Sequence, residues 1–237
     1  MIADWLLSSI DPSRPHNVSL EMAWHGRLMV IAWGVLLPAG VLAARFFKIM
    51  PGQDWPTVVD NRTWWRTHLT TQYLGGIAVV VAIYLIWDNR DGGSANFWHR
   101  NIGWTVVGLA AIQFASGWLR GTHGGPTHPR WDGSIAGDHY DMTLRRRIFE
   151  GVHKSCGYIA LVFAVFSIMS GLWIANAPKW MVVMLVGWWV VLISMFVALH
   201  RMGPRRVSTY QAIWGPGEDH PGNRRILPKP HRPRQLE

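Results

Sequence analysis

The sequence has little charge and almost no cysteine. Cys156 is the single cysteine among 237 residues, which excludes a disulfide framework and every zinc or iron–sulfur site built from several thiolates. Charged residues make up 16% of the chain, well below the roughly 25% of an ordinary soluble domain. Sixteen tryptophans and a net charge of +9 leave two classes open at this point: a nucleic-acid-binding protein, or a membrane protein with interfacial aromatics and basic loops.

Long stretches without any Asp, Glu, Lys or Arg decide between these classes. They are residues 28–44, 67–87, 101–119, 155–178 and 180–199. A helix needs about 20 apolar residues to cross the hydrocarbon core, and the tryptophans gather at the ends of these runs, apart from the cations, as in an interfacial aromatic belt. We therefore expect an all-α integral membrane protein, a four-helix transmembrane bundle plus a fifth transmembrane helix. The predicted spans are about 22–45, 65–87, 99–119, 153–176 and 179–200.

The basic residues predict the orientation. Segments 45–66, 120–154 and 200–237 carry 18 Lys and Arg residues, and the alternate segments carry 5. Because cytoplasmic loops hold the excess of Lys and Arg, we expect a multi-pass protein of the cell (inner) membrane. Its N-terminal segment 1–19 would lie outside, the domain 20–200 in the membrane, and the basic, proline-rich tail 201–237 in the cytoplasm. Such a tail is not expected to form a core of its own; it is either disordered or lies along anionic lipid or a partner.

Four histidines share one position, the N-terminal end of a predicted span: His25, His68, His99 and His153. Successive spans alternate in direction, so His25 and His99 would lie near the outer surface, and the other two near the inner surface. Helix bundles hold cofactors between side chains of facing helices, and two imidazoles can serve as the axial ligands of a haem iron. A zinc site is disfavoured because each face has only two histidines, with no carboxylate or cysteine beside them.

The neighbours of these histidines favour a flat cofactor. Gly103 and Gly157 each lie four residues, one helical turn, after a histidine, where a missing side chain leaves room for a porphyrin. Small residues also allow helices to pack closely in membranes, and that interpretation stays open for the glycines alone. Arg27, Arg100 and Lys154 either pair with haem propionates or extend to the interface.

The spans resemble the transmembrane core of the cytochrome b561 family, including its ferric-reductase-like and DOMON-linked members. The matching segments are WHGRLMVIAWGVLLPAGVLAARFFK (24–48), WWRTHLTTQYLG (64–75), HRNIGWTVVGLAAIQFASG (99–117) and RRRIFEGVHKSCGYIALVFAVFSIMSG (145–171).

This resemblance implies two haem b groups, one ligated by His25 with His99 and the other by His68 with His153. It also points to a candidate inner-face donor site at Arg45, Lys48 and Arg66. The sequence departs from the family in having no helix before the core and no fused DOMON or other redox domain.

We accordingly expect transmembrane electron transfer through two bis-histidine haems, with a redox donor and acceptor on opposite faces. The enzyme class stays open among ascorbate-, quinone- and ferric-reductase-like oxidoreductases. One alternative is the cytochrome b subunit of a larger membrane complex that links quinone to a periplasmic redox partner. The expected protein partner is then the rest of such a complex, or a second copy in a homodimer. Another is a structural membrane subunit without haem. Apart from the bilayer and these redox partners, no nucleic-acid partner is expected.

Overall fold

The computed structural model describes residues 1–88, 96–120, 138–201, 207–217 and 220–223. The described residues are helical, with one isolated bridge between Ser9 and Pro178. The helices are α1 (Ile2–Leu7), α2 (Leu20–Met29), the π-helix η1 (Val30–Leu36), α3 (Leu37–Phe46), α4 (Thr63–Leu85), α5 (Asn96–Trp118), α6 (Asp138–Asp141), α7 (Leu144–Ile174), α8 (Lys179–Arg201) and α9 (Thr209–Trp214). The predicted all-α membrane fold is confirmed.

Within the described part of the chain, four helical stretches are long and apolar enough to cross a membrane: Leu20–Phe46, Thr63–Leu85, Leu144–Ile174 and Lys179–Arg201. The first is continuous through α2, η1 and α3. Helix α5 has the same 23-residue length as α4 and α8 but is less apolar, since it carries polar residues such as Asn101, Thr105 and Gln113. The predicted span 99–119, which α5 contains, therefore stays a prediction that the length of this helix supports.

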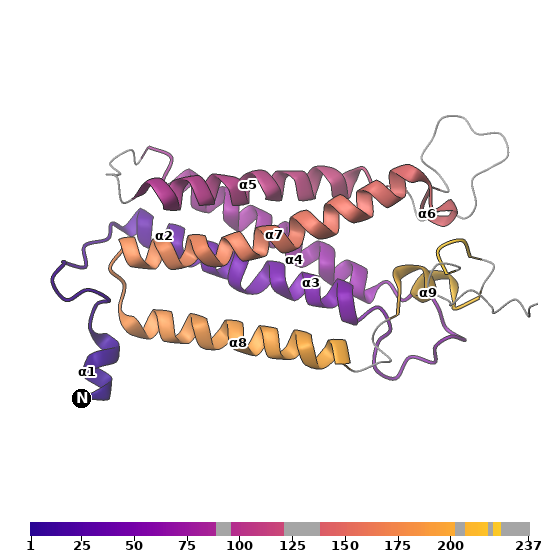
Figure 1. Cartoon of the computed structure of the whole chain (residues 1–237), viewed down its shortest axis with the longest axis horizontal. Coiled ribbons are helices and arrows are strands. Elements are labelled where there is room, and N and C mark those ends of the chain that lie inside the picture. Colours follow the sequence, from indigo (N-terminus) through magenta and orange to yellow (C-terminus); the bar gives the residue numbers. More distant parts are fainter. Residues whose placement is uncertain (89–95, 121–137, 202–206, 218–219, 224–237) are drawn as a thin grey trace, which may run out of the picture.

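The long helices lie side by side and alternate in direction (Figure 1). Helix α5 packs mainly on α7, and the stretch α2–η1–α3 packs mainly on α4. A buried core joins these two pairs halfway along the bundle and includes Trp33, Val79, Val106 and Ala164. Helix α8 runs along the side of the bundle, against α3. This arrangement brings the starts of α2 and α5 to one end, and the starts of α4 and α7 to the other.

Pro38 explains how α8 is attached to the first span. A proline has no N–H and cannot donate to the carbonyl four residues earlier, which here belongs to Gly34. The indole Nε1 of Trp188 on α8 donates to that carbonyl at 2.7 Å. An unpaired backbone carbonyl is costly in a membrane, so this hydrogen bond both satisfies Gly34 and joins α8 to the bundle.

Helix α7 begins well before the predicted start of the fourth span, at Leu144 rather than near 153. The hydroxyl of Thr143 accepts from the backbone N–H of Arg146 at 3.3 Å and caps the helix. Hydropathy marks the apolar part of a helix and says nothing about a polar extension beyond it. The span predicted at about 153–176 therefore lies within a longer helix.

Part of the C-terminal tail packs on the protein, which the sequence did not predict. Tyr210, Ala212 and Ile213 of α9 are buried, and the backbone carbonyl of Ala212 accepts from the N–H of Asp60 at 2.9 Å. His220 stacks on the ring of Trp214 with 4.6 Å between ring centroids. These aromatic side chains provide apolar area that the basic, proline-rich composition of the tail conceals.

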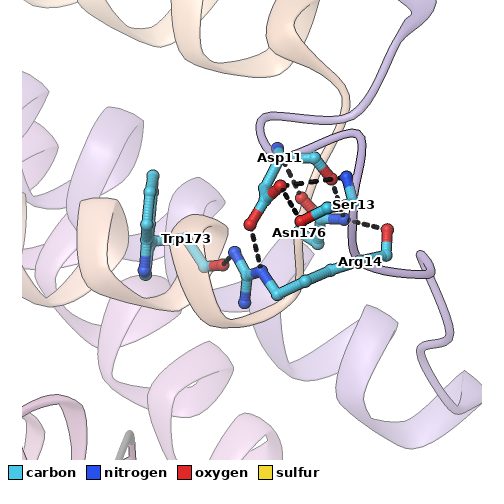
Figure 2. A network of polar contacts seen from close by, with 5 residues as sticks. All are labelled: Asp11, Ser13, Arg14, Trp173 and Asn176. Atoms are coloured by element: carbon cyan, nitrogen blue, oxygen red, sulfur yellow. Dashed lines mark hydrogen bonds and ion pairs between the residues drawn. The ribbon is translucent and has the colours of Figure 1, made fainter.

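The N-terminal segment is fixed to the turn between α7 and α8 (Figure 2). Asn176, which is 1% exposed, accepts from the backbone N–H of Asp11 at 2.8 Å and donates to the carbonyls of Asp11 and Arg14 at 2.9 and 2.6 Å. Arg14 in turn donates to the carbonyl of Trp173 at 3.1 Å. Helix α1, which precedes this segment, exposes Trp5 and Leu7, and its position in the outer interface stays a prediction.

Candidate functional site

The four histidines form two facing pairs, one near each end of the bundle. The ring centroids of His25 on α2 and His99 on α5 are 6.4 Å apart, with planes at 80°. Those of His68 on α4 and His153 on α7 are 6.5 Å apart, with planes at 73°. Each pair therefore joins one helix of the α2–α3/α4 half to one helix of the α5/α7 half.

The centroid distances fit one metal ion between each pair of rings. A metal–imidazole nitrogen bond is about 2.1 Å long and a ring centroid lies about 1.1 Å behind its nitrogen, so two rings on opposite sides of one ion have centroids about 6.4 Å apart. Imidazoles in direct contact face to face would lie closer. No group of three or more His, Cys, Asp or Glu that could hold a metal occurs among the described residues, which leaves a ligand pair rather than a zinc-type cluster.

Hydrogen bonds from a neighbouring helix orient the first two histidines. His25 Nδ1 lies 3.0 Å from the carbonyl oxygen of Ala82 on α4, and His68 Nδ1 lies 3.0 Å from the carbonyl oxygen of Gly40 on α3. Because a carbonyl only accepts, Nδ1 must carry the proton in both rings, and the lone pair is on Nε2. The first span and α4 thus each hold the histidine of the other.

Helices α5 and α7 likewise orient each other's histidine by hydrogen bonds. His99 Nδ1 lies 3.0 Å from the carbonyl oxygen of Ser167 and 3.1 Å from Ser170 Oγ. His153 Nδ1 lies 3.1 Å from Ser116 Oγ, whose own proton goes to the Gln113 carbonyl. Outer-shell partners of this kind fix the tautomer and orientation of metal-binding histidines.

Ser116 and Ser170 were not predicted to contact the histidines, although a repeated sequence pattern marks them. In both helices a Ser-Gly dipeptide follows the histidine at the same interval, Ser116-Gly117 after His99 and Ser170-Gly171 after His153. The shared interval could have drawn attention to the two dipeptides before the structure did.

A regular spacing underlies these contacts. The interval from His68 to Ala82 equals the interval from His153 to Ser167. At a rise of 1.5 Å per residue, such an interval places the two histidine pairs about 21 Å apart along the bundle. The interval from His25 to Gly40 is longer by one residue, and the π-helix η1 between them, with its wider turn, accommodates the additional residue.

Two glycines make room for imidazoles across the α5–α7 contact. A Cβ at Gly171 would lie 3.0 Å from His99 Cε1, and one at Gly117 would lie 4.0 Å from His153 Cε1. The predicted glycines Gly103 and Gly157 instead lie beside side chains of the opposite helix, at 3.7 and 3.4 Å from an added Cβ. These contacts fit close helix approach, the interpretation left open above; that the two glycines leave room for a porphyrin stays a prediction.

The aromatic side chains between the two pairs separate into buried and exposed ones. Trp33 is buried in the central core. Trp104, in contrast, is 51% exposed and meets Trp87 edge to face. Of Trp33, Trp87 and Trp104, Trp33 is therefore the one that lies in the protein interior between the two histidine pairs.

The predicted propionate partners differ in their surroundings. Arg27 and Arg100 are exposed, and the guanidinium of Arg27 lies over the Trp24 ring at 5.1 Å. Lys154 is 62% exposed and pairs with Glu150 at 3.1 Å.

The candidate inner-face donor residues differ in burial. Arg45 and Arg66 are exposed, whereas Lys48 is buried and donates to the Val207 carbonyl at 3.0 Å. Burial and the nearby Arg45 and Lys154 charges lower the pKa of Lys48 to about 8. His200, at the end of α8, stacks on Phe196 and is exposed, so it does not take the place of His68 or His153.

Comparisons with known proteins agree with this arrangement. The family described as eukaryotic cytochrome b561 matches residues 24–123, which include His25, His68 and His99. A cytochrome b561, DM13 and DOMON domain-containing protein of Arabidopsis thaliana is 29% identical over 148 residues, 62% of this chain and 14% of the relative. A cytochrome b561 and DOMON domain-containing protein of the same plant is 28% identical over 161 residues, 66% of this chain and 28% of the relative.

A third relative is ferric-chelate reductase 1 of Homo sapiens, which is 27% identical over 158 residues, 66% of this chain and 23% of the relative. The chain thus spans less than a third of the length of these curated relatives. No solved structure matches it. The family match and the relatives agree on one assignment: the transmembrane part of the chain is similar to the cytochrome b561 family.

Proposed function

We propose that this protein transfers electrons across the membrane through two haem b groups. His25 and His99 hold one near the outer face, and His68 and His153 hold the other near the inner face. The observation that carries this proposal is the pair of imidazole separations, 6.4 and 6.5 Å, at two levels of one bundle. Haem b binding is supported by the similarity to the cytochrome b561 family.

Each haem, when bound, supplies a one-electron ferric/ferrous couple, and the chain supplies the ligands and their orientation. The protonated Nδ1 of His25 and His68 is fixed by a backbone carbonyl, so Nε2 is the available ligand atom. These carbonyls belong to helices that are rigid in the bundle. The imidazoles therefore change little in position when the charge on the iron changes.

The histidine pairs lie in an environment that favours electron transfer over chemistry at the iron. Two histidines would hold each haem, and a haem held in this way would supply electron transfer rather than chemistry on oxygen or a substrate. The apolar core between the two levels, with Trp33 and Ala164 among its members, excludes water. The direction of the spans, the Lys and Arg distribution and the cell membrane follow the sequence prediction and belong to this proposal.

The acceptor we propose is a ferric chelate on the outer face. The relative named ferric-chelate reductase 1 supports this substrate class, as does the N-terminus-outside orientation. In this scheme an inner reductant would lose one electron for each external Fe³⁺ reduced to Fe²⁺, and the two histidine pairs would hold the haems that supply this one-electron chemistry. The reaction class is then a transmembrane oxidoreductase.

Proteoliposomes test this function. Purified protein in vesicles loaded with ascorbate should reduce external ferric citrate, measured as the appearance of a ferrous chelate. His153→Ala should abolish the transfer and lose one haem while the other is kept. His200→Ala is the matched control, an exposed histidine at the same end, and should behave as the wild type. Equal rates in all three proteins would contradict the proposal.

We propose a quinol as a second candidate for the inner reductant, in line with a cytochrome b subunit linking quinone to an outer partner. A cavity of about 330 Å³ lies between α3, α4 and α8 and is lined by apolar side chains with the hydroxyls of Thr63 and Thr67. Thr67 adjoins His68 in sequence. Decylubiquinol should then reduce the haem of the wild type faster than that of Thr67→Leu, whereas equal rates would remove this candidate.

A further inference from the structure

His16, in the segment before α2, makes the same kind of hydrogen bond as the histidines of the bundle. Its Nδ1 lies 2.8 Å from the carbonyl oxygen of Ala175, just as Nδ1 of His25 and of His68 contacts a backbone carbonyl. Because a carbonyl only accepts, Nδ1 of His16 carries the proton and the lone pair is on Nε2. His220 has the opposite arrangement, since its Nδ1 accepts from a backbone N–H at 3.0 Å. His16 is exposed, so its Nε2 is oriented as a metal ligand and is open to solvent.

His16 lies at the end of the bundle that holds the outer histidine pair. The N–H of Ala175 donates to the carbonyl of Gly171, one turn earlier on α7, at 2.9 Å. An added Cβ at Gly171 would lie 3.0 Å from His99 Cε1, so Gly171 marks the level of His99. One helical turn is about 5.4 Å long. The Ala175 carbonyl, which holds the His16 ring, therefore lies about one turn farther out than His99.

The segment that carries His16 is fixed to this end of the bundle by several contacts. The N–H of Ile10 donates to the carbonyl of Ala177 at 3.0 Å, and Arg14 and the buried Asn176 add the hydrogen bonds drawn in Figure 2. Asn176 has a φ of 47°, a left-handed conformation that persists only where its surroundings fix it. The backbone of the segment and the Nδ1 of His16 are thus both held, which gives Nε2 a defined place.

We propose that Nε2 of His16 is an outer-face ligand for a chelated ferric ion. It replaces one water molecule on a chelate that leaves a coordination position open, since imidazole is a good ligand of iron and copper. The chelator supplies the remaining ligands, so the site needs no cluster of protein donors. The Fe³⁺ takes one electron, which the inner reductant loses; the Fe–Nε2 bond then breaks, water returns, and chelated Fe²⁺ leaves. This inference rests on the proposed function and names how its acceptor is held.

Two ferric acceptors separate a ligand role of His16 from a structural one. Ferric nitrilotriacetate has open coordination positions, whereas cyanide fills every position of ferricyanide. In proteoliposomes loaded with ascorbate, His16→Ala should raise the ratio of the KM for ferric nitrilotriacetate to the KM for ferricyanide about tenfold, the scale on which metal affinity depends on such contacts. Asn17→Ala, which changes the exposed neighbour, is the matched control and should keep the ratio of the wild type.

Copper binding gives a second measurement that needs no electron transfer. Cupric iminodiacetate also has open positions, and the EPR spectrum of Cu²⁺ shows nitrogen splitting when an imidazole binds it. His16→Ala should lose one bound copper per chain relative to the wild type and Asn17→Ala. Equal copper binding in the three proteins, or an unchanged KM ratio in His16→Ala, overturns the proposal. If the wild type reduces neither ferric acceptor, the proposed function has failed, and the copper titration alone decides whether His16 holds a metal ion.

Discussion

A methyl group added at Gly171 should disturb the outer histidine pair and leave the inner pair intact. The added Cβ would lie 3.0 Å from His99 Cε1, whereas carbon atoms pack best at about 3.5–4.0 Å. The ring must then move by roughly 0.5–1 Å to restore that separation. It cannot do so freely, since its Nδ1 is bonded to the Ser167 carbonyl at 3.0 Å and to Ser170 Oγ at 3.1 Å.

The expected loss of haem affinity in Gly171→Ala follows from these contacts. Weakening one or two hydrogen bonds of about 0.5–1.5 kcal/mol each, or overpacking at about 1–3 kcal/mol, gives a cost of about 1–2 kcal/mol. At about 1.4 kcal/mol per factor of ten, the outer haem of Gly171→Ala should bind roughly five- to thirtyfold more weakly. Titration of the apoprotein with haem b, followed by the absorbance of the reduced α-band, measures this loss.

Gly117→Ala is the matched control. Gly117 occupies the equivalent position on α5, but an added Cβ would lie 4.0 Å from His153 Cε1, an ordinary contact. Both sites should therefore keep their affinity in this variant. The reasoning is refuted if the two alanine variants lose haem equally, or if Gly171→Ala weakens the inner site rather than the outer one.

Three further predictions concern the parts that hold the bundle together. Asn176→Ala removes the three hydrogen bonds to Asp11 and Arg14 at a residue with φ of 47°, and should cost about 2–4 kcal/mol; faster proteolysis of the N-terminal segment reports it, and unchanged proteolysis would contradict it. Trp188→Phe removes the hydrogen bond from the indole to the Gly34 carbonyl and should lower stability by about 1 kcal/mol, seen as a lower melting temperature in detergent. Lys48 has a pKa lowered from 10.5 to about 8 by burial, so between these values the unfolded chain binds more protons and stability should rise with pH, by about 3 kcal/mol in full. Lys48→Met should lack that rise in melting temperature between pH 8 and 10, and parallel curves would count against it.

The sequence predicted the spans, and the end of the bundle at which each histidine lies, because both depend on local patterns. Charge-free runs mark helices that cross a membrane, and alternation of direction then places His25 and His99 at one end and His68 and His153 at the other. The structure brings each of these pairs together. Their role as haem ligands stays a prediction.

The contacts that orient the histidines could not be read from hydropathy. A serine such as Ser170 is unremarkable in an apolar run, and its role depends on the register between α5 and α7. The π-helix before Pro38 changes the register of the first span against α4 by one residue, which no periodicity in this short segment reveals. The packing of α9 against Glu150 similarly depends on contacts between distant segments, through the Tyr210 hydroxyl.

The haem content of the purified chain tests the central claim most directly. Pyridine haemochrome absorbance, divided by the protein concentration from amino-acid analysis, gives haem b per polypeptide. The two histidine pairs predict two haems per chain, both low-spin and six-coordinate. A value near zero, or a high-spin spectrum with an open iron position, would contradict the account.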